Sequence, residues 1–266
     1  MKMTLMTFNL RYNTPNDGDN IWTNRADRAA RIMLDHDPLV IGTQEGYHVM
    51  LTDLQERLPD YAWIGQGRKG GHENEHCAIF YKKAELEVLE QGQFWLSETP
   101  DVPASKSWDS NLPRICTWAR FGQIGTGTQF YLYNTHLDHL GQQARENGAG
   151  MIWDLLCKHR DASGLPAVIM GDLNSRPYEL PIRFLRGEAE IGGRTTALID
   201  AYSKLSGAIG LTAHSFEGGA EGEPIDYIFV TPDVKVTEVA VDRRKIDGAY
   251  PSDHYPIVAK IELNGD

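Results

Sequence analysis

Polar residues stand at the ends of apolar, strand-like runs in six distant segments of this chain. They are Asn9, Glu45, His136, Asp138, Asp172, Asn174, Asp226, Asp253 and His254. Such runs belong in a protein core, where even a neutral polar group without a partner costs about 2–7 kcal/mol. A core tolerates this many polar groups only if they meet and satisfy one another. The pattern therefore predicts one oxygen-rich pocket, which suits a hard divalent cation.

The length of the chain and the spread of these positions favour one domain. The chain has 266 residues, and neither half contains the full set of polar positions. We expect a single catalytic domain over residues 1–266, a size within the range of single α/β domains. The sequence has neither an 18-residue apolar run nor the apolar region of a signal peptide. These features predict a cytoplasmic protein without a membrane partner, and no obligate protein partner is indicated.

The charge balance bears on the substrate. The chain has 26 basic and 37 acidic residues, a net charge of −11. A protein that binds long nucleic acid through its phosphates needs a basic surface. Short basic stretches such as Arg68–Lys69 are typical of solvated surface. The balance favours a small phosphorylated substrate over a duplex, without ruling out nucleic acid.

Hydrophobic periodicity and turn residues predict a mixed α/β order. Helices are expected over residues 24–36, 47–58, 142–160, 178–186 and 197–205. Between and after them lie many strand-like runs, several of them adjacent without an intervening helix. Adjacent strands of this kind pair antiparallel, because parallel pairs need a long crossover. The predicted fold is α/β, with two mostly antiparallel sheets packed face to face and helices outside, a four-layer α/β sandwich.

Six short motifs occur in an informative order: TFNLR, TQE, NTHLDH, GDLN, IDYIF and SDHYP. In this order they resemble the endonuclease/exonuclease/phosphatase family, which includes deoxyribonuclease I, deadenylases and inositol polyphosphate 5-phosphatases. The segments NTHLDH, FWLSETPD and PRICTWARF are most similar to its deadenylase-like bacterial branch. The resemblance covers essentially the whole chain. It implies a two-sheet sandwich that hydrolyses phosphoesters with Mg²⁺ or Mn²⁺.

The resemblance and the side-chain chemistry together suggest the metal ligands. Glu45 ends an apolar strand, where an ionised carboxylate is costly unless a cation or base neutralises it. Asn9 is expected to offer a neutral oxygen to the same ion or its waters, and Asp253 a second carboxylate. Oxygen ligands favour Mg²⁺ or Mn²⁺ over Zn²⁺. The number of ions, one or two, stays open.

The catalytic roles also follow from the resemblance. Asp172 would orient or deprotonate the attacking water, while Asn174 and His136 would bind the phosphoryl group. His254 would act as a general acid or base, since the pKa of histidine lies near neutral pH. Asp226 would fix the tautomer of His254. Which of Asp172 and His254 is the base stays open.

Supporting and substrate-binding residues are expected around this set. Glu75 corresponds to the carboxylate that pairs with such a histidine in relatives, with Glu73 as an alternative in the same loop. Asp138 is expected to support its neighbours without touching the substrate. Arginine can bind phosphate in a bidentate fork, although structural salt bridges explain Arg25 and Arg114 equally well. The candidate substrate contacts are Arg25, Asn111 and Arg114.

Three functions compete at this point. The leading hypothesis is a metal-dependent phosphoester hydrolase, a phosphodiesterase or phosphatase, acting on a small sugar or nucleotide derivative. The second is an exonuclease or endonuclease acting on single-stranded nucleic acid. The third is a non-catalytic binding module on the same fold. The third would predict a damaged catalytic set, yet all expected members are present.

Overall fold

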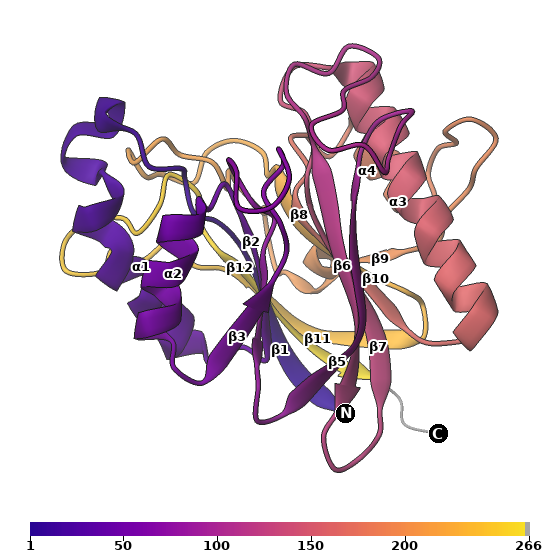
Figure 1. Cartoon of the computed structure of the whole chain (residues 1–266), viewed down its shortest axis with the longest axis horizontal. Coiled ribbons are helices and arrows are strands. Elements are labelled where there is room, and N and C mark those ends of the chain that lie inside the picture. Colours follow the sequence, from indigo (N-terminus) through magenta and orange to yellow (C-terminus); the bar gives the residue numbers. More distant parts are fainter. Residues whose placement is uncertain (264–266) are drawn as a thin grey trace.

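The computed structural model describes residues 1–263 and shows two six-stranded sheets packed face to face. Helices cover their outer faces, so the layers follow the order helix, sheet, sheet, helix (Figure 1). The fold predicted from the sequence is confirmed. Within residues 1–263, no helix has both the length and the apolar character needed to span a bilayer.

The first sheet combines the two ends of the chain. Its strand order is β11-β12-β1-β2-β4-β3, and only β1 and β2 pair parallel. The C-terminal strand β12 lies between β1 and β11. The strands are β1 (Lys2–Asn9), β2 (Val40–Gln44), β3 (Tyr61–Ile64), β4 (Ile79–Lys82), β11 (Val234–Val241) and β12 (Ile257–Leu263).

The second sheet repeats this arrangement. Its order is β5-β6-β7-β8-β10-β9, and only β7 and β8 pair parallel. In each sheet the parallel pair is therefore flanked by antiparallel strands on both sides. The strands are β5 (Leu86–Trp95), β6 (Ile115–Gln123), β7 (Gln129–His136), β8 (Ala167–Asp172), β9 (Ile199–Asp200) and β10 (Asp226–Val230).

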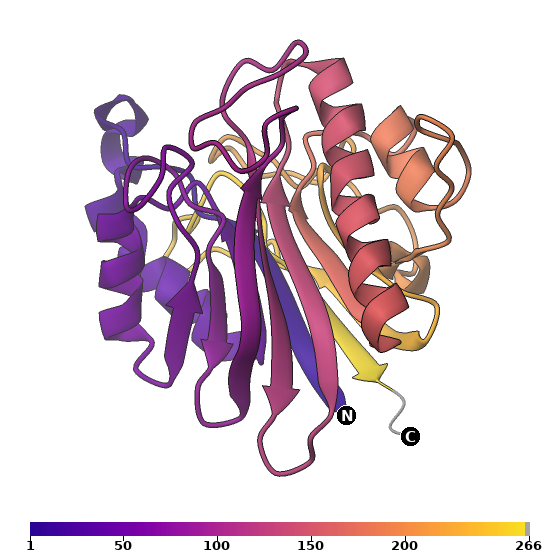
Figure 2. The same ribbon diagram turned by 45° about the vertical axis from the view of Figure 1, so that its right-hand side comes forward.

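A long helix connects the strands of each parallel pair. Helix α1 (Trp22–His36) joins β1 to β2, and α3 (Gln142–Ser163) joins β7 to β8. Helices α1 and α2 (His48–Arg57) cover the first sheet, whereas α3 covers the second (Figure 1). Figure 2 shows α3 crossing the outer face of its sheet. Helix α1 buries the apolar stripe that its sequence predicts and ends at Asp37, which has left-handed dihedral angles and precedes Pro38.

Two predicted helices need correction. Residues 197–205 form the short strand β9 and the 3-10 helix η2 (Ala201–Lys204), because the Asp200 carboxylate accepts a hydrogen bond from the Tyr202 amide and caps this single turn. Helix α4 (Leu180–Leu185) is shorter than the predicted 178–186. The other 3-10 helix, η1 (Pro15–Asn20), lies in the loop after β1.

The apolar core between the sheets contains one polar link. Gln44 Nε2 donates to Asn134 Oδ1 at 2.7 Å, and Asn134 Nδ2 donates to the carbonyls of Thr43 and Ala78, both at 2.9 Å. Both amide side chains are fully buried. Because buried amides are costly without partners, this link favours one relative placement of the sheets. It lies directly behind the strand ends that carry the site.

Candidate active site

The polar residues predicted from the sequence gather where the two parallel pairs end. Strands β1 and β2 bring Asn9 and Glu45 to this edge, while β7 and β8 bring His136 and Asp172, which are register partners. Strands β10 and β12 run antiparallel to these. Asp226, the first residue of β10, and His254, just before β12, therefore reach the same edge. This is the edge at which parallel α/β sheets commonly bind ligands.

Carboxylates crowd one side of the site. Asn9 Nδ2 donates to Glu45 Oε1 at 3.1 Å and to Asp172 Oδ2 at 3.0 Å. Burial raises the pKa of Asp172 and of Asp253, and the nearby Glu45 carboxylate raises both further. The Asn9 amide bridges Glu45 and Asp172 only, and Arg11 Nε lies 3.7 Å from Asp253 Oδ2. A further cation beside these acidic groups would favour their charged forms.

This donor set fits a divalent cation. Glu45 and Asp253 offer only oxygen ligands, and Glu45 has a left-handed φ of 63°, a strained conformation of the kind found at functional sites. Asn9 Oδ1 accepts a hydrogen bond from the Arg11 backbone amide at 2.9 Å. The Asn9 side chain therefore presents its nitrogen, and not its oxygen, to the carboxylates. To act as the predicted oxygen ligand, the Asn9 side chain would need its amide oxygen and nitrogen exchanged. Hydrogen bonding determines which of these two orientations is assigned.

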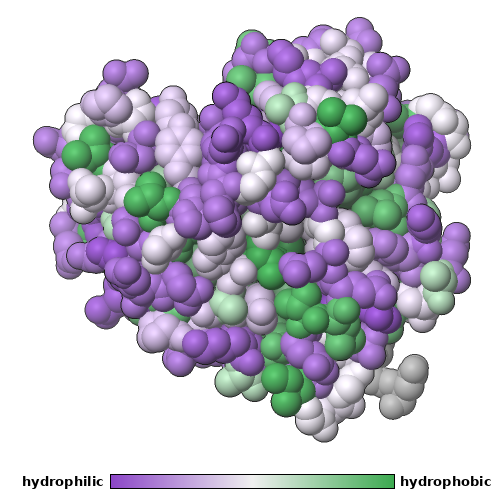
Figure 3. Space-filling model, viewed as in Figure 1, coloured by the Kyte–Doolittle hydropathy of each residue, from purple (hydrophilic) through white to green (hydrophobic). Residues whose placement is uncertain are grey.

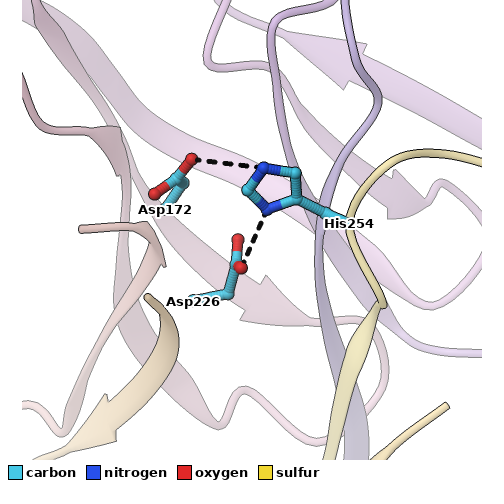
Figure 4. A group of neighbouring side chains, drawn as sticks. All are labelled: Asp172, Asp226 and His254. Atoms are coloured by element: carbon cyan, nitrogen blue, oxygen red, sulfur yellow. Dashed lines mark hydrogen bonds and ion pairs between the residues drawn. The ribbon is translucent and has the colours of Figure 1, made fainter. Parts of the chain in front are cut away.

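A carboxylate–histidine pair lies beside the carboxylates (Figure 4). His254 Nδ1 donates to Asp226 Oδ2 at 2.9 Å, and His254 Nε2 lies 4.0 Å from Asp172 Oδ2. Burial opposes the charged form of His254, but the carboxylates, Asp226 foremost, raise its pKa well above the usual value. Thr212 Oγ1 donates to the same Asp226 oxygen at 2.6 Å.

Asp172, Asp226 and His254 place one ligand atom each within 4.8 Å of one another and could also hold a metal ion. The hydrogen bond from His254 to Asp226 instead leaves Nε2 free to transfer a proton near Asp172. The arrangement therefore suits general acid–base chemistry.

His136 contrasts with His254. Its Nε2 lies 3.3 Å from Asp172 Oδ2. Burial, with Arg114, His254 and Arg68 nearby, lowers the pKa of His136 well below its usual value. His136 is thus a neutral group beside Asp172, and a neutral imidazole can donate a hydrogen bond to a phosphoryl oxygen.

The predicted pairing of Glu75 with His136 is wrong. Glu75 Oε1 accepts from Arg68 Nη2 at 2.7 Å, because the turn between them brings the two side chains together. Burial raises the pKa of Glu75 to about 7, and Arg68 opposes the shift. The alternative, Glu73, is exposed. Arg68 itself is 8% exposed and lines the pocket, so its interpretation as solvated surface was also wrong.

Asp138 organises the loop beside Arg114. Its buried carboxylate accepts backbone hydrogen bonds from Leu112, Leu140 and Gly141. These bonds, with Arg114 nearby, outweigh burial and lower the pKa of Asp138 to about 2. Arg114 lines the pocket, as expected of a substrate contact.

The other two candidate substrate contacts lie elsewhere. Asn111 is exposed and lies beside the pocket, with its amide 3.5 Å from His139 Nε2. Arg25 is fully buried and donates to the backbone carbonyls of Leu10, Arg11 and Asn20. The structure thus gives Arg25 a structural role in holding the loops after β1.

The pocket that joins these groups encloses about 480 Å³, a size suited to a small molecule. Figure 3 shows a notch with a mostly hydrophilic rim at the upper edge of the molecule, between the helices of the first sheet and the loops above the second. The pocket is lined by Arg11, Tyr12, Glu45, Tyr47, Arg68, Glu75, Leu112, Arg114, His136, His139, Asp172, Asn174, Asp253 and His254.

Comparison with known proteins agrees with this geometry. The sequence model of the endonuclease/exonuclease/phosphatase family matches residues 6–254. The chain belongs to this family. Enzymes of the endonuclease/exonuclease/phosphatase family hydrolyse phosphoesters, which accounts for the carboxylates and the Asp–His pair at one strand edge.

Solved structures of this family include two similar proteins from Bacteroides thetaiotaomicron. One is a mannosyl-6-phosphatase, 33% identical, with a TM-score of 0.89 over 98% of this chain and 100% of that chain. The other is described as an endonuclease/exonuclease/phosphatase family protein, also 33% identical, with a TM-score of 0.90 and 98% of each chain covered.

More distant members of the family support the fold. Nocturnin of Drosophila melanogaster is 23% identical over 91% of this chain, which spans only 42% of that protein. The human Nocturnin catalytic domain has a TM-score of 0.71 at 17% identity, covering 99% of this chain and 95% of that chain. At these identities the matches bear on the fold alone.

Proposed function

We propose that the protein is a Mg²⁺- or Mn²⁺-dependent phosphoester hydrolase that acts on a small phosphorylated molecule, a sugar phosphate foremost. The observation that carries the proposal is the convergence of Glu45, Asp172 and Asp253 beside the Asp226–His254 pair, in a pocket of small-molecule size. The 33% identity to a mannosyl-6-phosphatase over the whole chain supports the substrate class.

Glu45, Asp253 and Asn9 would hold the cation, and a bound cation would neutralise charge on the phosphoryl oxygens. Asp172 faces the position of the attacking water, where its carboxylate accepts the water's proton as the oxygen–phosphorus bond forms. His254 holds a proton on Nε2 and donates it to the departing alkoxide, while Asp226 stabilises the imidazolium.

Two further residues bind the phosphoryl group in this proposal. His136 lies beside Asp172 and donates to a non-bridging oxygen. Asn174 has a left-handed φ of 44°, and its Nδ2 donates to the Leu137 carbonyl at 3.0 Å. Because an amide nitrogen carries two hydrogens, the second remains available to the substrate.

The test is hydrolysis of a mixed panel with Mg²⁺, Mn²⁺ or EDTA. The panel holds mannose 6-phosphate, glucose 6-phosphate, p-nitrophenyl phosphate, bis-(p-nitrophenyl) phosphate and a labelled single-stranded oligonucleotide. We expect EDTA-sensitive turnover of sugar phosphates that is absent in Glu45→Gln purified in the same way. Faster turnover of the oligonucleotide than of the sugar phosphates would show that the substrate is single-stranded nucleic acid and not a sugar phosphate. Turnover that persists in Glu45→Gln would overturn the metal assignment.

A further inference from the structure

Two arginines from separate segments line one wall of the pocket. Arg68 and Arg114 are only 8% and 5% exposed, and His136 lies beside them in the lining. Each is anchored on one side of its guanidinium. Arg68 donates to Asn74 and Glu75, both at 2.7 Å, whereas Arg114 Nη2 lies 3.0 Å from His139 Nδ1.

Each guanidinium keeps one nitrogen free. Within residues 1–263, Nη1 of neither Arg68 nor Arg114 has a hydrogen-bond partner, and neither atom is among the fully buried unpaired ones. Both nitrogens therefore remain accessible from the pocket. An arginine so deeply buried is held in one orientation before any ligand arrives, which favours tight binding of an anion.

The two like charges also repel each other. Burial lowers the pKa of Arg68, and Arg114 lowers it further although Glu75 opposes the shift. Each arginine already has one carboxylate partner, Glu75 at 2.7 Å for Arg68 and Asp138 at 3.5 Å for Arg114. An anion bound between the two guanidinium groups would interact favourably with both. Glu45 and Asp253 line the same pocket and would repel this anion unless a cation neutralises them.

The shape of this wall limits what can bind there. A recess of about 10 Å³ adjoins the main pocket. It is lined by Glu45, Arg68, Glu75, His76, Cys77, Pro113, Arg114, Ile115 and His136. This volume is about that needed for one water molecule. An unesterified phosphate oxygen fits such a recess, whereas a sugar or nucleoside substituent does not.

We propose that Arg68 and Arg114 form a clamp for the unesterified oxygens of a phosphate monoester dianion, so that the pocket selects monoesters over diesters. The inference rests on the proposed hydrolase function and narrows its substrate class. A diester carries one charge fewer and directs a carbon substituent where a monoester has an oxygen. Both differences weaken its binding at this wall.

The decisive experiment compares two substrates with the same leaving group. p-Nitrophenyl phosphate is a monoester, and methyl p-nitrophenyl phosphate is the matching diester. We expect Arg68→Gln and Arg114→Gln each to lower kcat/KM for the monoester by about 10- to 100-fold, as expected for lost charge-assisted hydrogen bonds, and for the diester by less than about threefold. An equal fall for both esters, or no fall, would overturn the clamp.

Two control variants guard against trivial explanations. Arg31→Gln removes an exposed arginine whose side chain is 69% accessible and pairs with Asp35. It should leave kcat/KM for both substrates unchanged. Arg114→Lys keeps the positive charge but loses the bidentate hydrogen bonds of the guanidinium group. We expect kcat/KM for the monoester alone to fall, by less than in Arg114→Gln. Thermal melting of each variant confirms folding, and if Arg68→Gln does not fold, the two Arg114 variants decide.

A binding measurement separates the clamp from the proposed function. Isothermal titration of inorganic phosphate with Mg²⁺ present measures binding at the clamp without turnover, because inorganic phosphate carries no ester bond to hydrolyse. If the protein hydrolyses neither of these esters nor the sugar phosphates of the panel, the hydrolase proposal fails. Phosphate binding that Arg68→Gln abolishes would still support the clamp. No phosphate binding to the unaltered protein, or binding unchanged in Arg68→Gln and Arg114→Gln, contradicts it.

Discussion

Two units of this molecule have the same topology and different chemistry. The first unit is β1, α1 and β2, and the second unit is β7, α3 and β8; each forms the parallel centre of its sheet. The first unit ends in Asn9 and Glu45, and the second in His136 and Asp172. In the proposed mechanism, equivalent strand ends thus deliver cation ligands from one sheet and the groups around the attacking water from the other. The scaffold fixes where side chains gather, and the identity of single residues decides what they do.

Single substitutions should disable the two units separately. Asp172→Asn removes the proton acceptor of the second unit, and we expect kcat to fall by about 10³–10⁴-fold, near the upper range for general base catalysis. Mg²⁺ affinity, measured by calorimetry, should change by less than about threefold. The melting temperature should not fall, since burial raises the pKa of Asp172 and disfavours its charge in the folded state. Loss of Mg²⁺ binding would mean that the second unit also holds the cation.

The matching change in the first unit is Glu45→Gln. We expect kcat/KM to fall by about 10²–10³-fold, since a metal ion contributes several kcal/mol to transition-state stabilisation. Here Mg²⁺ affinity should fall at least tenfold, and raised Mg²⁺ should restore part of the activity. If Glu45→Gln loses turnover but binds Mg²⁺ normally, Glu45 is not a cation ligand and the proposed difference between the two units is wrong.

A smaller loss of activity is expected from substitution of Thr212, which contacts the Asp226 carboxylate. The Thr212 hydroxyl donates to Asp226 and accepts from the amides of Ile225 and Asp226 at 3.0 and 3.3 Å. Thr212→Val should lower kcat by roughly tenfold, a loss typical of supporting hydrogen bonds, with KM nearly unchanged. Thr212→Ser keeps the hydroxyl and should retain most of the activity. Equal losses in the two variants would point to packing of the methyl group.

The smallest effect on chemistry is expected for Asp138→Asn, which alters the loop after β7. Stability should fall by about 1–3 kcal/mol at neutral pH, because the Asp138 carboxylate accepts several buried backbone bonds. The folded-state pKa of about 2 lies below the usual 3.8, so this stabilisation is present above pH 4 and is lost as pH falls towards 2.

Urea denaturation at pH 7 and pH 3 measures this difference. The gap in unfolding free energy between the protein and Asp138→Asn should narrow at the lower pH, and a gap that widens would contradict the assignment.

The sequence predicted the strand ends well because burial and polarity conflict there. Asp172 and Asp226 stand out after and before apolar runs, and the structure pairs these strands in register, with Asp226 opposite Asp172. Residues in loops carry no such signal. Arg68 sits in a glycine-rich turn that reads as surface, and Thr212 lies in a loop whose contact with Asp226 spans 14 positions.

Two errors have a common cause. Arg25 was expected to contact substrate because arginine suits phosphate, and Glu75 was expected to face His136 because relatives pair such residues. In the structure both side chains meet nearer partners, the carbonyls of the β1 loop for Arg25 and the Arg68 guanidinium for Glu75. Residue type constrains the kind of partner, whereas the path of the loop decides which partner is reached.

The pairing of β12 with β1 has a consequence for biosynthesis. Strand β1 is synthesised before the other strands of this fold, yet one of its edges stays open until residues 257–263 exist to pair with it. His254 arrives just before that strand. A nascent chain therefore carries Asn9, Glu45, His136 and Asp172 before the strands that complete the site have been made. The proposed hydrolytic activity should appear only after β12 has paired with β1.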